Sequence, residues 1–202
     1  MKKNVLFLSA LAVMLSFSGC DEKTKLANNI QGTWEASPEK LTTPSDIASA
    51  NMIKIFDITT VPGKSEGTID VTGLVSFVSP VPSGSDVLQN VSVSTSGIIS
   101  AKGTWNAIDD DEIMVFVDPK SLEVTVDTAA VELKYDVLTT QDLSELTSLK
   151  PAVAEHVKHQ IMIVAGSKIT GINKIDDIKI KDNMMSCEIG KQDMTFRRQV
   201  AE

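Results

Sequence analysis

The feature that most constrains the fold is a series of segments rich in Val, Ile and Thr, which favour extended strands over helices. These segments are 30–35, 52–58, 69–78, 87–95, 98–108, 113–117, 131–137, 177–181, 184–189 and 193–199. Turn residues separate them, as at Pro62-Gly63 and Asp118-Pro119. Residues 113–117 are apolar on both faces and predict a strand covered on both sides. Short strands with tight turns favour an antiparallel barrel, although a sandwich can have the same spacing.

One segment, near residues 140–166, breaks this period. Leucines recur at helical spacing from Leu143 to Leu149, and Pro151 suits the first position of a second helix. An apolar stripe of Val and Ile follows, and Gly166 is expected to cap it. The predicted fold class is therefore all-β, mainly an antiparallel barrel, with a helical insertion near residues 140–166.

The first twenty residues indicate where the chain is sent. Lys2 and Lys3 precede an apolar run, Val5 to Leu15, that is too short to anchor a helix across a bilayer. The next residues, Phe17-Ser18-Gly19-Cys20, resemble the lipobox of bacterial lipoprotein signal peptides, with Phe17 where Leu is usual. The resemblance implies cleavage before Cys20 and acylation of its thiol. An ordinary secretory signal is the alternative.

Three segments follow from this interpretation. Residues 1–19 are a lipoprotein signal peptide, residues 20–29 are the lipidated cysteine with a polar tether, and residues 30–202 are one β domain. The expected location is the bacterial cell envelope, with the protein anchored to a membrane, the outer one being favoured, through Cys20. Asp21-Glu22 fits either surface export or retention at the inner membrane, so the membrane and its face stay open. The net charge of −8 argues against a nucleic acid partner.

The start of the β domain carries a second resemblance. Gly32-Thr33-Trp34 is similar to the G-x-W opening strand of lipocalin-like domains, in particular of lipocalin-like lipoproteins of Bacteroidetes. In that family the Trp plugs the closed end of the barrel and an Arg from the last strand stacks over it. The resemblance implies a closure role for Gly32, Trp34 and Arg198, since Arg198 shares a strand face with Phe196. A core Trp beside a solubilising basic end is the alternative.

No catalytic group, metal site or cofactor site emerges from the pattern. The acidic run 109–112 has no calcium-loop spacing and is interpreted as a solvated turn. His156 and His159 lie three residues apart on the predicted helix, but further zinc ligands are not identifiable. Cys187 sits on the apolar face of its strand, where a lone thiol is expected to be buried. The chain is therefore not expected to be an enzyme.

Two binding functions remain. In the first, the barrel holds a small apolar or amphipathic ligand, lined by inward side chains such as Phe56, Phe77 and Met114. In the second, a filled barrel is a structural or interaction module that presents loops or the helical insertion to another envelope protein. An envelope hydrolase would need converging acids or histidines.

Overall fold

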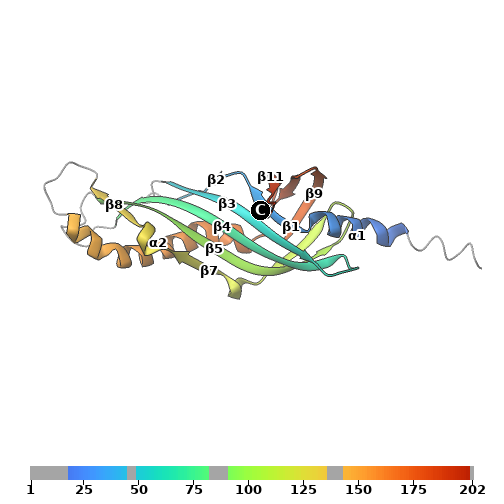
Figure 1. Cartoon of the computed structure of the whole chain (residues 1–202), viewed down its shortest axis with the longest axis horizontal. Helices are drawn as coiled ribbons and strands as arrows, with labels where there is room; N and C mark the ends of the chain where they lie inside the picture. Colours follow the sequence, from blue (N-terminus) through green and yellow to red (C-terminus); the bar gives the residue numbers. More distant parts are fainter. Residues whose placement is uncertain (1–17, 45–48, 82–90, 136–142, 201–202) are drawn as a thin grey trace, which may run out of the picture.

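The computed structural model describes residues 18–44, 49–81, 91–135 and 143–200 (Figure 1). The predicted signal segment up to residue 17, the start of the strand predicted at 87–95 and residues 140–142 of the insertion lie outside these ranges. The described part contains helices α1 (Ser18–Ile30) and α2 (Leu143–Thr170) and 3₁₀ turns η2 (Pro119–Ser121) and η3 (Thr128–Ala130). Its strands are β1 (Gly32–Ala36), β2 (Glu39–Lys40), β3 (Ser49–Thr60), β4 (Glu66–Pro80), β5 (Val91–Ala107), β6 (Ile113–Val117), β7 (Glu123–Val126), β8 (Glu132–Tyr135), β9 (Lys174–Lys181), β10 (Met184–Ile189) and β11 (Gln192–Arg198).

A closed barrel forms because β1 pairs with a strand on each side. Trp34 of β1 is opposite Arg198 of β11 on one side and Phe56 of β3 on the other. The remaining ring follows the order β11, β10, β9, β6, β5, β4 and β3, and every pairing is antiparallel. Eight strands therefore close on themselves, which confirms the predicted antiparallel barrel and decides against the sandwich.

The sheet continues beyond the barrel because β4 and β5 are long, with 15 and 17 residues. The first part of β5 pairs with β8 and then with β7. Its last residues pair with β6, which is one of the eight strands of the ring. The inner face of this extension is covered by α2, which contacts β4, β5, β7 and β8. A Cβ on Gly97 of β5 would lie 2.5 Å from Cδ1 of Ile161, so the helix packs directly on the strand. The helical insertion is thus confirmed as part of the fold.

The core lies inside the barrel and under α2. Along β4 every second residue is buried, as expected for strands with one apolar face. The bulkiest fully buried side chains include two tryptophans and three phenylalanines: Trp34, Trp105, Phe56, Phe77 and Phe196. The rings of Phe56 and Phe196 are stacked with their centroids 4.8 Å apart. Strands β3 and β11, which are far apart in the sequence, thereby share an aromatic contact.

Two details of the helical insertion differ from the prediction. A single helix spans Leu143–Thr170, and Pro151 lies inside it rather than opening a second helix. Gly166 does not cap the helix, because the chain stays helical for four more residues and Thr170 Oγ1 donates to the Gly166 carbonyl at 3.0 Å. Buried side chains such as Val164, Ala165 and Ile169 continue the apolar contact across that glycine. Tertiary packing therefore outweighs the weak helix propensity of glycine.

Residues 20–29, predicted as a polar tether without regular structure, are part of the helix α1. Leu26, Ala27 and Ile30 are buried on one side of this helix. The polar residues before them gave no apolar stripe long enough to predict a helix. Within the described ranges, neither helix carries an apolar stretch long enough to cross a membrane.

Candidate functional site

The end of the barrel beside α1 (the closed end) brings together Gly32, Trp34 and Arg198, the three residues predicted to close the barrel. The guanidinium carbon of Arg198 lies 4.1 Å from the centre of the Trp34 ring, which is fully buried. Gly32 has a φ of +120°, and a Cβ there would lie 2.8 Å from a guanidinium nitrogen of Arg198. A glycine is needed at this position both for its backbone conformation and for the approach of the arginine.

The same side chains also cap the end of α1. Arg198 donates from one guanidinium nitrogen to the Asn29 carbonyl at 2.6 Å and from the other to the Gln31 carbonyl. The indole nitrogen of Trp34 donates to the Ile30 carbonyl at 2.7 Å. The carbonyls at the end of a helix have no partner within the helix, so these donors satisfy groups that would otherwise need water. The contacts of Trp34 and Arg198 therefore join β1 to β11 and also attach α1 to the barrel.

The barrel interior around the predicted ligand-lining phenylalanines is filled. Phe56 and Phe77 expose 0% and 1% of their surface. A side chain that lined a hollow large enough for water would keep some accessible surface, so neither residue lines one here. Met114, predicted to line the interior, does not do so. It is 37% exposed, because Ile113 and Val115 of β6 face inward and Met114 faces outward. The strand predicted at 113–117 to be covered on both sides is covered on one.

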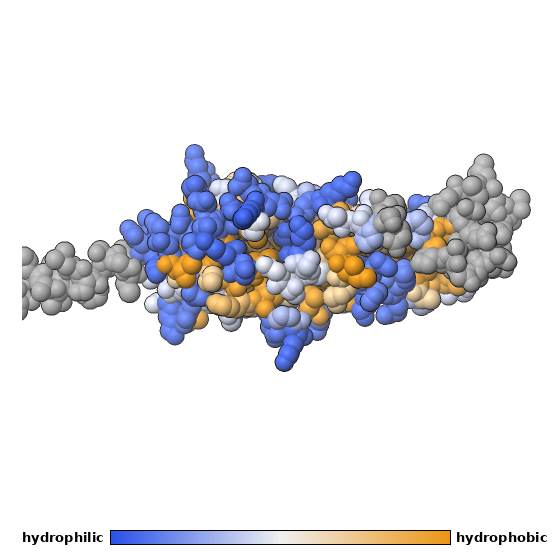
Figure 2. Space-filling model, turned by 180° about the vertical axis from the view of Figure 1, so that it is seen from behind, coloured by the Kyte–Doolittle hydropathy of each residue, from blue (hydrophilic) through white to orange (hydrophobic). Residues whose placement is uncertain are grey.

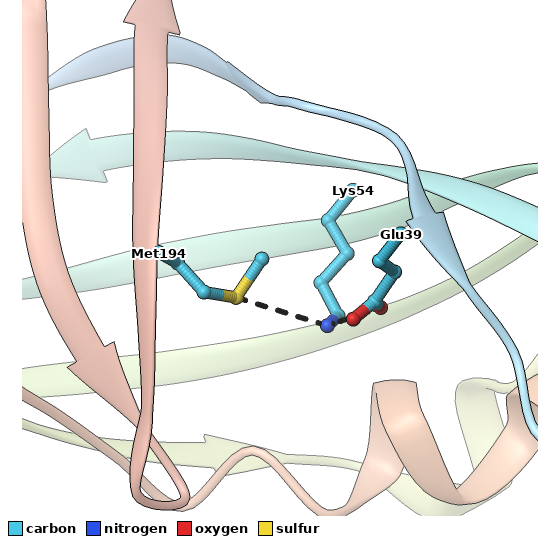
Figure 3. Close-up of polar contacts among 3 residues, drawn as sticks. All are labelled: Glu39, Lys54 and Met194. Carbon is cyan, nitrogen blue, oxygen red and sulfur yellow. Dashed lines mark hydrogen bonds and ion pairs between the residues drawn. The ribbon is translucent and has the colours of Figure 1, made fainter.

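A buried ion pair inside the barrel was missed by the sequence analysis (Figure 3). Lys54 of β3 is 3% exposed, and its Nζ lies 2.6 Å from Oε1 of Glu39 on β2 and 3.9 Å from the sulfur of Met194. The signal was present in the sequence, since strand alternation places Lys54 on the same face as Met52 and Phe56. The pair joins β2, which has one strand neighbour, to the interior of the ring.

The outer face of the extended sheet carries an apolar hollow that the sequence analysis also missed. Ile53, Leu74 and Ile98 are direct neighbours on β3, β4 and β5, and Thr125 of β7 continues the row. Together with residues such as Ser76 and Ser96 they line a shallow hollow of about 570 Å³. Ile98 is 46% exposed although it sits in the middle of a strand. Orange areas on the opposite face show that apolar surface is exposed there as well (Figure 2).

One carboxylate of the acidic turn after β5, that of Glu112, forms an ion pair. Lys174 of β9 lies 2.7 Å from Glu112 and 2.8 Å from Asp176. Hydrogen bonds to these two carboxylates raise the pKa of Lys174, and the bond from Lys174 lowers the pKa of Asp176. Desolvation and then the neighbouring carboxylates, Asp110 foremost, raise the pKa of Asp111. Among the described residues there is no group of three or more acidic, His or Cys side chains arranged to hold a metal ion.

The remaining singled-out residues stay apart from these sites. His156 is half-buried and His159 is exposed on α2. Cys187 is buried, and burial raises the pKa of its thiol to about 12. The backbone at Cys20 belongs to the first turns of α1. No protein-family model matches the sequence, and no curated protein matches it significantly.

Proposed function

We propose that this protein is a lipid-anchored interaction module of a bacterial cell envelope, acylated at Cys20, which binds another envelope protein through the outer face of its sheet. The proposal assigns it binding and no catalysis. The lipobox supports the anchor. The contrast between the two faces of the same strands supports the binding surface, and it is the observation that carries the proposal.

That contrast is clearest at two adjacent residues of β5. Ile99 points inward and is fully buried, whereas Ile98 points outward and is 46% exposed. The exposed side chains of Leu74 and Ile98, with the half-buried Ile53 beside them, cost solvation free energy unless a partner covers them. The row formed by Ile53, Leu74 and Ile98 is continuous across the strands and lies within one hollow. An apolar side chain of a partner protein suits such a hollow.

A small apolar or amphipathic ligand is the second candidate. The hollow of about 570 Å³ has the size of a small-molecule site, and hydroxyl groups of Thr125, Ser76 and Ser96 lie among its apolar residues. A ligand of this kind would bind on the outside of the barrel, since Phe56 and Phe77 leave no hollow beside them.

Site-specific photo-crosslinking in native membranes tests the first candidate. A photoreactive phenylalanine analogue replaces Ile98 in the full-length protein, and a matched control replaces Phe116, which is 59% exposed on the outer face of β6. We expect a discrete protein adduct from position 98 and none from position 116. Equal adducts at both positions, or none at either, would contradict a partner surface at the hollow.

A methyl NMR titration with dodecanoate tests the second candidate. Shifts confined to Ile53, Leu74 and Ile98 would place an amphipathic ligand in the outer hollow. Shifts of buried methyl groups such as those of Ile99 and Ile161 would instead support binding of the ligand in the interior of the fold. Unchanged spectra would argue against a fatty-acid-like ligand at either place.

A further inference from the structure

Helix α1 is fixed to the closed end of the barrel along its last two turns. Leu26 and Ala27 are buried, and the Ala27 carbonyl accepts a hydrogen bond from Thr60 Oγ1 at 2.8 Å. Arg198 and Trp34 bind the carbonyls that follow. Contacts to β1, β3 and β11 thus hold the helix from several sides, so α1 cannot swing freely relative to the barrel.

The position of Cys20 on this helix limits how far an anchor can lie from the barrel. Cys20 and the first buried residue, Leu26, belong to one continuous helix. Six residues at the rise of an α-helix correspond to about 9 Å. A disordered tether over residues 20–29 would have allowed ~30 Å. An acyl group on Cys20 therefore holds the closed end close to the bilayer.

Two hairpin turns lie at the same end of the molecule as α1 (Figure 1). The β3–β4 turn follows Thr60, which contacts α1, and the β5–β6 turn contributes Asp110 to a hollow of about 240 Å³ that Lys25 and Asn29 of α1 also line. Each turn begins with an apolar residue that is exposed: Val61 is 39% exposed and Ile108 is 38% exposed. Beside an anchored helix these two apolar residues fit the headgroup region, whereas the carboxylates of Asp109 to Asp111, which follow Ile108, keep the turn out of the acyl chains.

We infer that the closed end of the barrel is a membrane-facing surface, which α1 holds against the bilayer so that Val61 and Ile108 meet the lipid headgroups. The long axis then points away from the membrane, with the start of α2 at the far end (Figure 1). Ile53 of the outer hollow lies seven residues along β3 from Thr60, or roughly 23 Å, so the hollow faces water. This inference rests on the acylation of Cys20 proposed above.

Fluorescence quenching on vesicles tests the orientation with the mature lipidated protein. A fluorophore is attached at Ile108→Cys or, as the matched control, at Val78→Cys, which is 37% exposed on β4 far from the closed end. The buried Cys187 is not labelled. Phosphatidylcholine vesicles carry a nitroxide on the lipid headgroup. We expect most of the fluorescence to be lost at position 108 and no loss at position 78.

A second variant separates the orientation from the anchor. Insertion of a flexible Gly/Ser segment of about twelve residues between Asp21 and Glu22 keeps Cys20 and the barrel but breaks the connection through α1. We expect this variant to float with vesicles and to lose the difference between the two positions. The protein without the insertion should float with vesicles and be quenched more at position 108 than at position 78. If it floats but is quenched equally at both positions, the orientation is overturned and the anchor is not. Failure of the unmodified protein to float with vesicles would overturn the anchor, and the orientation with it.

Discussion

The guanidinium of Arg198 covers the indole of Trp34, 4.1 Å from the ring centre, and at the same time binds two carbonyls at the end of α1. One side chain of the last strand therefore contacts the first strand and the helix before it. A planar guanidinium suits this arrangement, because it stacks with its face and donates hydrogen bonds from its edge.

Replacing this arginine tests how much the cluster stabilises the fold. We expect Arg198→Ala to lower the free energy of unfolding by about 2 kcal/mol, because a cation–π contact and two charged hydrogen bonds are lost. The neighbouring Arg197→Ala is the control and should change it by less than about 0.5 kcal/mol, since Arg197 is exposed. Urea unfolding measures both. Equal destabilisation by the two substitutions would refute a special role for Arg198.

The ion pair between Lys54 and Glu39 should behave as a coupled unit. Lys54→Met alone leaves the Glu39 carboxylate at a nearly buried site without its cation, and we expect a loss of about 3 kcal/mol. The double variant Lys54→Met with Glu39→Leu should unfold within about 1 kcal/mol of the wild type, because no buried charge then remains. A double-mutant cycle from urea unfolding gives the coupling energy. Strictly additive effects of the two substitutions would show that the pair is not coupled.

The same substitution at two glycines should have opposite effects. Gly166→Ala in α2 adds a Cβ whose nearest neighbours are 3.7 Å away, so we expect stabilisation by about 0.5–1 kcal/mol from helix propensity. Gly67→Ala in β4 would place its Cβ 1.8 Å from the Thr59 carbonyl oxygen, which is backbone and cannot yield. We expect it to cost about 3 kcal/mol or to prevent folding. Thermal unfolding compares the two variants, and a stable Gly67→Ala protein would contradict this packing.

Cys187 should make stability depend on pH in the alkaline range. Burial raises the pKa of its thiol from 9.0 to about 12, so the unfolded chain loses this proton at a lower pH than the folded one. The stabilisation is complete below pH 9 and is lost as the pH rises towards 12. We expect the stability difference between wild type and Cys187→Ala to fall by roughly 1.4 kcal/mol between pH 8 and 10. A constant difference over that range would mean that the thiol ionises equally in both states.

The sequence predicted the parts of the fold that follow from strand period and from one motif. Strand segments, their antiparallel arrangement and the helical insertion came from the spacing of apolar residues. The contact between Trp34 and Arg198 was predicted from the resemblance of Gly32-Thr33-Trp34 to the G-x-W strand of lipocalin-like domains, because both arginines of the chain, at positions 197 and 198, lie in its final predicted strand.

The remaining features depend on which element covers which face. Helix α1 is stabilised by side chains of Thr60 and Arg198, so residues 20–29 carry no signal of it themselves. Met114 and Phe116 could not be assigned to the outside, since β6 is apolar on both faces and only the ring decides which face is inner. Lys54 could have been found from alternation alone, because a charged residue interrupts the inward face of β3.

The seam between β1 and β11 has a consequence for how the polypeptide matures. Asn29 and Arg198, which meet at that seam, are 169 positions apart. The chain must extend as far as Arg198 before Trp34 can be covered, so ring closure follows the formation of local strand pairs. Loss of β11 would leave the ring open at β1 and would remove the two hydrogen bonds of Arg198 to the end of α1.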